Sequence, residues 1–286
     1  MDDLIKDSTR KYGLLLDLLF ELGDSINELK SGYDERLLDA RGILIKFINH
    51  CCTINQLINS TRYKFKDKNI SFLDFSSIDV VARSAIESFL VLYYVFDEPI
   101  NEIEEELRYN AWLMSGLVSR MSFEPFSEKS RKVLAKDVEF FNSVKDKLKN
   151  NAIFRNLSDK QQNEIVLKGK WKLEGEYNGK IKTPSWIDIG IKAGFDKNTA
   201  KDIYKFLSGY THCDSLSIIQ IREAHDNAIR RNLADGTLEI MIMVMAFMIK
   251  TVTNVFHETG KVLTQNNINT ELYKLVIDTF TSKSCQ

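Results

Sequence analysis

The chain has 286 residues, of which 44% are hydrophobic and 28% are charged, and its 39 basic and 40 acidic residues give a formal net charge of -1. This length supplies a substantial core for one large domain or two small ones. The balanced charge excludes a global field that would draw the protein to nucleic acid or anionic lipid, so any such contact has to be local.

The composition favours helices. Three prolines and 13 glycines are few for this length, which favours long uninterrupted helices over a β architecture with many turns. The four cysteines show no CxxC spacing, and the N-terminal sequence MDDLIKDS lacks the basic and apolar regions of a signal peptide. We therefore expect an all-α, cytoplasmic protein.

Apolar residues recur at helical spacing through the first half of the chain. The pattern predicts helices over residues 14–31, 34–65 and 78–96, a fourth after Pro99, a fifth from Ser127 and a short sixth from Ser158. Ser76 or Ser77 is the expected cap of the third helix, and Ser158 with Gln161 has the spacing of a capping box.

The helical period is lost between Gly169 and Gly194. Asn178-Gly179 stands there between alternating residues, which is a β-hairpin signal. Helices are predicted again over residues 196–212, 215–231, 237–258 and 270–282. We expect a multi-helix bundle in one domain, 1–286, in which a small irregular or β-hairpin insertion, 169–186, separates N-terminal helices (1–168) from C-terminal helices (187–286).

The most apolar run covers residues 240–249. Glu239 and Lys250 bracket it, and about 20 apolar residues are needed to span a bilayer. The run therefore predicts a buried core helix whose methionines fill gaps, and no membrane association. It could equally line a homodimer.

Two predicted helices carry polar stripes where apolar residues are expected. Arg83, Glu87 and Tyr94 share one face of the first. Tyr204, Ser208 and His212 share one face of the second. Because buried polar groups are cheapest when they satisfy one another, we expect the two stripes to face each other, with Tyr94 and Asp214 at the margin.

These residues admit a structural and a catalytic interpretation. Arg83 and Glu87 form either a structural ion pair or an anion site in which Arg83 binds a phosphate and Glu87 holds the Arg83 guanidinium in place. His212 is either a hydrogen-bonded structural residue or a general acid and base at a helix C-terminus. Ser208 could then be a nucleophile, with Glu87 or Asp214 orienting the histidine. In this catalytic interpretation Tyr204, Tyr94 and Asp214 are the expected substrate-binding residues.

Other site classes lack their markers. The adjacent His and Cys residues at 50–52 and 212–214 do not have zinc-ligand spacing, and the chain contains no GxGxxG, P-loop or GxSxG motif. We therefore expect no cofactor and no metal. The basic segment 64–69 and the basic residues near Trp171 and Tyr177, which are Lys168, Lys170 and Lys172, either contact nucleic acid or are solvated loops.

Several of these short motifs resemble a known family. Arg83-Ser84 followed by Glu87, then Trp186, then Tyr204, Ser208 and His212 in YKFLSGYTH, are similar to the bacterial helical proteins catalogued as domain of unknown function 5677. The resemblance covers about residues 78–214. It implies a helical layout similar to HEPN domains, many of which are ribonucleases of toxin or phage-defence systems.

HEPN ribonucleases commonly carry Arg-x4-6-His on one helix. Here Arg222 and His225 are too close together for that motif, and no arginine precedes His212 at the required spacing, so Arg83 would have to meet His212 from another helix. Two hypotheses follow. One is a metal-independent ribonuclease effector that acts on RNA. The other is a non-catalytic helical sensor or scaffold subunit, with a protein partner or as a homo-oligomer, whose polar cluster is structural or holds a small anion.

Overall fold

The computed structural model describes residues 7–29, 32–173, 183–265 and 267–282. Its chain divides into two compact units. Unit 1 combines Met1–Tyr93 with Trp186–Gln286, and unit 2 is Tyr94–Ser185. Helices dominate both units, which confirms the all-α class. The assignment of 1–286 to a single domain stays a prediction.

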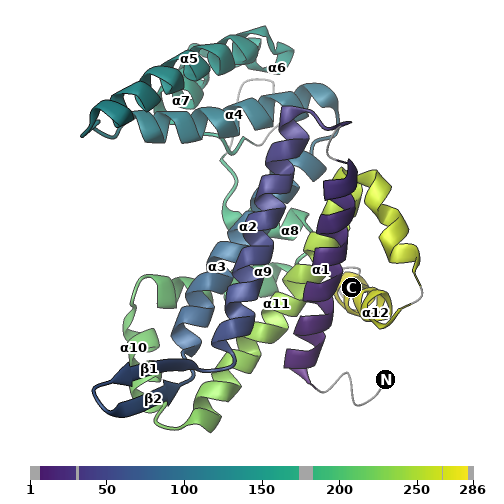
Figure 1. Ribbon diagram of the computed structural model, residues 1–286. Helices are drawn as coiled ribbons and strands as arrows, with labels where there is room; N and C mark the ends of the chain where they lie inside the picture. Colours follow the sequence, from purple (N-terminus) through teal and green to yellow (C-terminus); the bar gives the residue numbers. More distant parts are fainter. Residues whose placement is uncertain (1–6, 30–31, 174–182, 266, 283–286) are drawn as a thin grey trace. The chain divides into compact units, whose positions relative to one another are not determined.

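Unit 1 is built around α11 (Asn227–Val255), which packs against α1 (Ser8–Leu29) and α3 (Phe75–Leu92), while α2 (Glu35–Leu57) packs against α1 and α3 (Figure 1). The other helices of this unit are α8 (Trp186–Lys192), α9 (Lys197–Thr211), α10 (Ser215–Glu223), the 3-10 helix η3 (His257–Thr264) and α12 (Ile268–Ser282).

Helix α11 contains the apolar run of residues 240–249. Its methionines 241, 243, 245 and 248 are all buried in the unit, as expected for a core helix. Within the described part of the chain, α11 alone is long and apolar enough to cross a membrane, and 67% of its most apolar 18-residue window is buried inside the protein.

Two predicted helix boundaries in this region are wrong. The helix expected over 215–231 ends at Glu223, and α11 already begins at Asn227. The cause is Asp226, whose carboxylate accepts a hydrogen bond of 2.8 Å from the Ile229 amide and so caps a new helix. From there the helix continues without a break through the expected gap at 232–236.

The helix predicted over residues 34–65 is also too long. It ends at Leu57, and two antiparallel strands follow, β1 (Thr61–Phe65) and β2 (Lys68–Phe72). Ser60 and Lys66 have positive φ angles of 74° and 53°, which helices do not admit. The hairpin expected within 169–186 falls mostly on residues 174–182, outside the described residues; the flanking residues 169–173 and 183–185 have no regular secondary structure.

Helix α3 begins earlier than expected. Its cap is Asp74 and neither Ser76 nor Ser77, because the Asp74 carboxylate accepts the Ser77 amide at 3.1 Å. The chain then leaves α3 through the π-helical turn η2 (Tyr93–Asp97). A π turn holds more residues than an α turn, so it rotates the following side chains onto another face.

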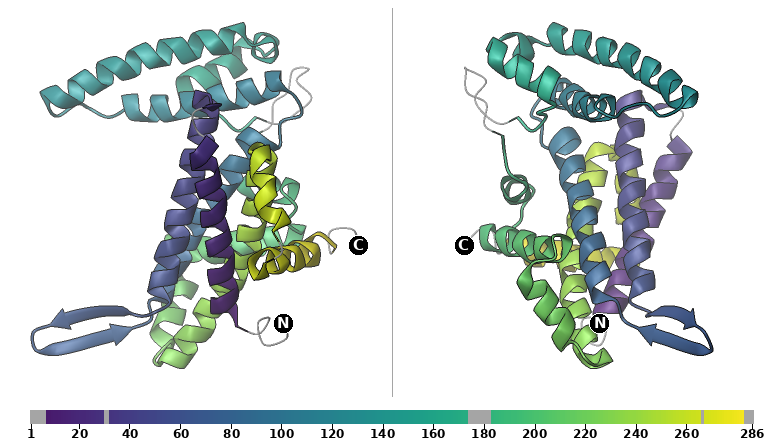
Figure 2. Two further views of the ribbon diagram at one scale, coloured as in Figure 1. Left: turned by 45° about the vertical axis from the view of Figure 1, so that its right-hand side comes forward. Right: turned by 90° about the vertical axis from the view of Figure 1, so that its left-hand side faces the viewer.

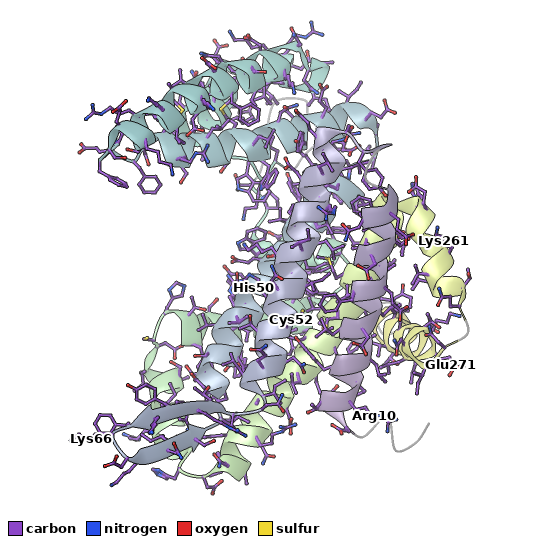
Figure 3. All side chains as sticks on the ribbon, in the orientation of Figure 1. Arg10, His50, Cys52, Lys66, Lys261 and Glu271 are labelled. Atoms are coloured by element: carbon purple, nitrogen blue, oxygen red, sulfur yellow. The ribbon has the colours of Figure 1, made fainter. Side chains whose placement is uncertain are left out.

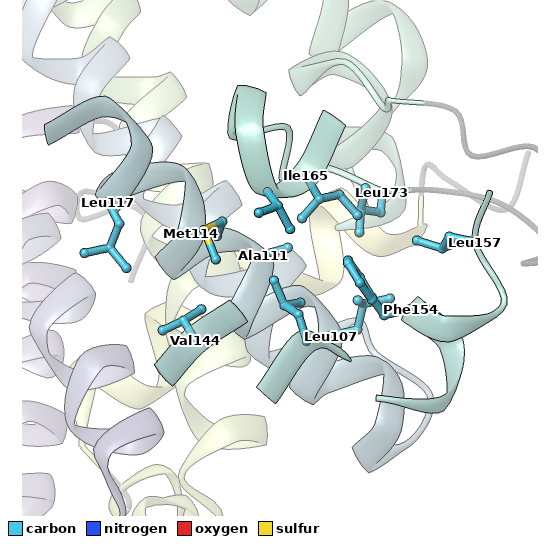
Figure 4. Close-up of a cluster of buried hydrophobic side chains, with 11 residues drawn as sticks. Leu107, Ala111, Met114, Leu117, Val144, Phe154, Leu157, Ile165 and Leu173 are labelled. Carbon is cyan, nitrogen blue, oxygen red and sulfur yellow. The ribbon is translucent and has the colours of Figure 1, made fainter. Parts of the chain in front are cut away.

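Unit 2 consists of α4 (Glu102–Met121), α5 (Glu128–Asn150), α6 (Ala152–Arg155) and α7 (Asp159–Lys168), preceded by residues 94–97 of η2. The structure confirms Ser127 as the cap of α5 and the capping box of Ser158 with Gln161 on α7. Apolar side chains from α4, α5, α6 and α7 form one buried cluster, part of which Figure 4 labels.

Candidate functional site between helices α3 and α9

The two helices that carry the polar stripes of unit 1 run antiparallel. Near the start of α3, the Phe75 ring lies 6.0 Å from the Tyr210 ring near the end of α9. Further along α3, the guanidinium carbon of Arg83 lies 3.9 Å from the centre of the Tyr204 ring. The stripes therefore meet through Arg83 and Tyr204.

Arg83 has two partners of different kinds. Its Nη2 atom forms an ion pair with Glu87 Oε1 at 2.8 Å, one turn further along α3. Its guanidinium lies on the face of the Tyr204 ring, an arrangement that attracts a cation to the π electrons. The Arg83 side chain is 11% exposed and that of Glu87 is 39% exposed, so the pair lies at the edge of the core.

The Nη1 atom of Arg83 is buried without a hydrogen-bond partner in the described part of the chain. Beside it is a cavity of about 10 Å³, space for at most one water molecule. Its other lining residues are mainly apolar and come from α3, α8, the α8–α9 turn and α9: Ile86, Leu90, Trp186, Gly190, Phe195, Ala200, Ile203, Tyr204 and Leu207. A phosphate group does not fit into this space.

His212 lies elsewhere on α9. It is exposed at the C-cap of the helix, where its backbone N–H donates to the Ser208 carbonyl at 3.0 Å. It follows Tyr204 by eight residues, roughly 12 Å along the helix axis. Because α3 and α9 run antiparallel, this displacement leads toward the start of α3 and away from Arg83. The structure does not bring the imidazole and the guanidinium into one pocket, and Ser208 lies between them, half-buried.

Asp214 has a structural partner. Its carboxylate accepts the Ser217 amide at 2.8 Å and caps α10. The turn before it is tight, with Cys213 at a φ angle of 51°. A Cβ atom on Gly209 would lie 2.5 Å from Asp214 Oδ2, so a larger residue there would displace the Asp214 carboxylate. The Asp214 side chain therefore serves as the N-cap of α10 in the turn between α9 and α10.

Tyr94 belongs to unit 2. Its hydroxyl donates to the Leu173 carbonyl at 2.7 Å, and the Arg108 guanidinium lies 4.3 Å from its ring centre. The helix α3 ends at Leu92, so Tyr94 lies beyond the helix that carries Arg83, in the π turn η2.

Sequence reasoning missed a serine and histidine pair between α2 and α3. Ser84 Oγ lies 3.1 Å from His50 Nε2, and Figure 3 labels His50. Burial and the charge of Lys46 lower the pKa of His50, which favours the neutral imidazole. Within the described residues no carboxylate is bonded to His50, so the orienting acid of a catalytic triad is missing. Spacing could not reveal a pair 34 residues apart.

A buried carboxyl group was missed as well. Asp79 on α3 is 1% exposed and accepts a hydrogen bond from Thr237 Oγ1 of α11. Burial raises the pKa of Asp79 to about 7, although the hydrogen bond from Thr237 opposes this shift. Burial and the charges of Asp79 and Asp214 raise the pKa of Tyr210. The signal available in the sequence was an acid one turn before Arg83 in an apolar helix.

In unit 2 the corresponding polar centre is Arg108. This residue is 3% exposed and forms ion pairs with Glu104 at 2.6 Å and with Glu98, while its Nη1 donates to the Tyr94 carbonyl at 2.9 Å. Glu104 and Arg108 are four residues apart on α4, a spacing that predicts such a pair. The cluster explains how a charged group is tolerated in the core of this unit.

Metal ligation finds no support in the described ranges: they contain no group of three or more His, Cys, Asp or Glu side chains that could hold an ion. Compared with models of protein families, with curated proteins and with solved structures, the chain matches none.

Proposed function

We propose that this chain is a non-catalytic helical module, a sensor or scaffold subunit, in which Arg83, Glu87 and Tyr204 hold α3 against α9. The observation that carries the proposal is the contact of 3.9 Å between the Arg83 guanidinium and the Tyr204 ring. Through this contact the Arg83 side chain of α3 packs against α9. The adjoining cavity of about 10 Å³ holds at most one water molecule.

The ribonuclease hypothesis requires a different geometry. A general acid or base has to lie within hydrogen-bond reach of the group that it protonates, and the arginine has to hold the same phosphate. His212 is exposed at the far end of α9, roughly 12 Å along the axis from Tyr204, with which Arg83 is stacked. This axial separation favours the structural interpretation over one phosphate held by both groups.

An RNA-cleavage assay separates the two hypotheses. The full-length protein is incubated with a labelled RNA that contains single-stranded and paired regions, beside His212→Ala and Arg83→Ala variants. We expect no cleavage above buffer in any sample. Cleavage by the unaltered chain that disappears in His212→Ala would overturn the proposal in favour of the ribonuclease.

Stability provides the positive test. Arg83→Ala removes the ring contact and leaves Glu87 without its partner, and we expect it to lower the free energy of unfolding by about 2 kcal/mol. His212→Ala changes an exposed side chain and should leave the free energy within roughly 0.5 kcal/mol of that of the unaltered protein. An unchanged urea midpoint for Arg83→Ala would argue against a role in packing.

A further inference from the structure

The hairpin of β1 and β2 is a two-stranded ribbon that extends away from the helices of unit 1, as the two views of Figure 2 show. Its strands pair Thr61 with Phe72 at the base and Phe65 with Lys68 at the tip. Every residue from Arg62 to Ser71 is exposed. The ribbon contributes almost nothing to the core, so its side chains are free for another purpose.

The two faces of this ribbon differ in chemistry. Directly opposed residues of an antiparallel pair share a face. One face therefore carries Tyr63, Phe65 and Ile70, which are 62%, 50% and 42% exposed, together with Lys68, the partner of Phe65. The opposite face carries Arg62 and Lys64. Leaving two aromatic rings exposed to water on one strand is costly. Because Tyr63 and Phe65 are two residues apart, their rings lie next to each other on the same face.

The ribbon is strongly cationic. Between residues 61 and 72 there are four basic side chains, Arg62, Lys64, Lys66 and Lys68, against the single acid Asp67. In the described structure none of the four cations has an ion-pair partner. This contrasts with Arg83, Arg108 and Arg120, each of which is paired with a carboxylate.

The cationic surface continues at the base of the ribbon. The Arg230 guanidinium of α11 lies 6.0 Å from the centre of the Phe72 ring, and its Nε donates to the Ala224 carbonyl at 2.9 Å. At the tip, Lys66 Nζ lies 5.4 Å from the Phe65 ring centre, and Figure 3 shows Lys66 at that end. Positive charge therefore accompanies the aromatic rings along the whole ribbon.

We propose that the β1–β2 ribbon binds single-stranded RNA, with Tyr63 and Phe65 stacking on unpaired bases. Lys66 and Lys68 would contact phosphates beside the rings, and Arg62 and Lys64 would contact phosphates from the opposite face as the strand wraps around the ribbon. Unpaired cations complement a polyanion, and aromatic rings stack on any base with an open π face. RNA loops and bulges present such bases, whereas a duplex keeps them stacked inside. The ribbon residues are distinct from the α3–α9 cluster, so this inference stands or falls independently of the proposed function.

The test is fluorescence anisotropy of a labelled 20-nucleotide oligouridine with the full-length chain, from 50 to 200 mM NaCl. Three to four phosphate contacts predict a loss of affinity of roughly 20- to 50-fold over this range. Tyr63→Ala combined with Phe65→Ala should weaken binding about tenfold or more. Lys64→Gln combined with Lys66→Gln should lower the slope of log affinity against log salt by about 1.4.

Matched controls exclude general charge and surface effects. Lys261→Gln combined with Lys274→Gln makes the same charge change on η3 and α12, where Lys261 lies far from Lys66 (Figure 3), and Phe20→Ala removes a ring of 46% exposure from α1. Both should bind like the unaltered chain. Helical circular dichroism checks that the ribbon variants remain folded, which their exposure predicts.

Several results would overturn the assignment. The first is absence of binding at 50 mM NaCl. The second is a loss of affinity in the control variants that equals the loss in the ribbon variants. The third is tighter binding of oligothymidine or of a 20-base-pair duplex than of oligouridine. Sedimentation would identify a ribbon that mediates self-association instead. In that case the combined Tyr63→Ala and Phe65→Ala substitutions would dissociate an oligomer, and the unaltered chain would not bind RNA.

Discussion

Arg83 on α3 and Tyr204 on α9 form a cation–π contact in which the guanidinium carbon lies 3.9 Å from the ring centre. The contact is a side-chain interaction between helices more than 100 residues apart in the chain. If the polar stripes serve packing, breaking this contact should therefore destabilise the protein.

A double-mutant cycle measures this contact. Arg83→Met and Tyr204→Leu are each expected to destabilise the protein, and their coupling energy should be about 1 kcal/mol because the guanidinium is largely desolvated. Urea unfolding of the four proteins provides the values. Arg10→Met, at an exposed position of α1, should be additive with Tyr204→Leu. Additivity of the Arg83 pair as well would contradict the structural role.

The buried carboxyl group of Asp79 makes stability depend on pH. Its pKa is about 7 in the folded protein and near 3.8 in an unfolded chain. Between these values the folded state keeps a proton that the unfolded state has released, so the free energy of unfolding falls as the pH rises from about 4 to 7, by about 4 kcal/mol in total. Above pH 7 this contribution is constant.

Asp79→Asn tests this dependence because an amide has no charge to desolvate and its oxygen still accepts from Thr237. At pH 8 the variant should be more stable than the unaltered protein by a few kcal/mol, and at pH 4 the two should nearly coincide. Urea midpoints at four pH values between 4 and 8 give the difference. Parallel curves for the two proteins would show that Asp79 does not titrate in this range.

Asp214 should behave as a helix cap and not as a substrate ligand. Asp214→Ala removes the acceptor of the Ser217 amide and should cost about 1 kcal/mol, whereas Asp214→Asn retains a capping oxygen and should cost only a few tenths. Thermal melting followed by circular dichroism distinguishes them. Equal destabilisation by both substitutions would indicate that the charge itself is required.

Arg108 should be the most sensitive charged residue of unit 2. Arg108→Met leaves Glu98 and Glu104 without their common cation, and breaking a buried ion pair in this way typically costs 3–5 kcal/mol. Hydrogen exchange of the α4 amides should report the loss within this unit. Arg155→Met, at an exposed position on α6, is the matched control and should leave exchange unchanged.

The features that sequence predicted best are local. Ser127 and the pair of Ser158 with Gln161 were placed correctly because a capping hydrogen bond joins residues only three positions apart. Local patterns gave a wrong prediction where a helical and a strand signal overlapped in the same segment. Apolar periodicity continued the second helix to Phe65, although alternating aromatic residues and the positive φ angle at Ser60 turn this segment into a ribbon.

The sequence by itself determined an all-α architecture, the positions of several helix caps and the presence of two polar stripes, since each depends on composition or on neighbours within a few turns. Only the tertiary structure decided which members of those stripes meet. The antiparallel packing of α3 and α9 pairs Arg83 with Tyr204 and leaves His212 at an exposed helix end. Tyr94 lies beyond α3 in the π turn η2, where it contacts Arg108 and Leu173. Side-chain spacing fixes a face of one helix, but the direction and register of its neighbour come from packing.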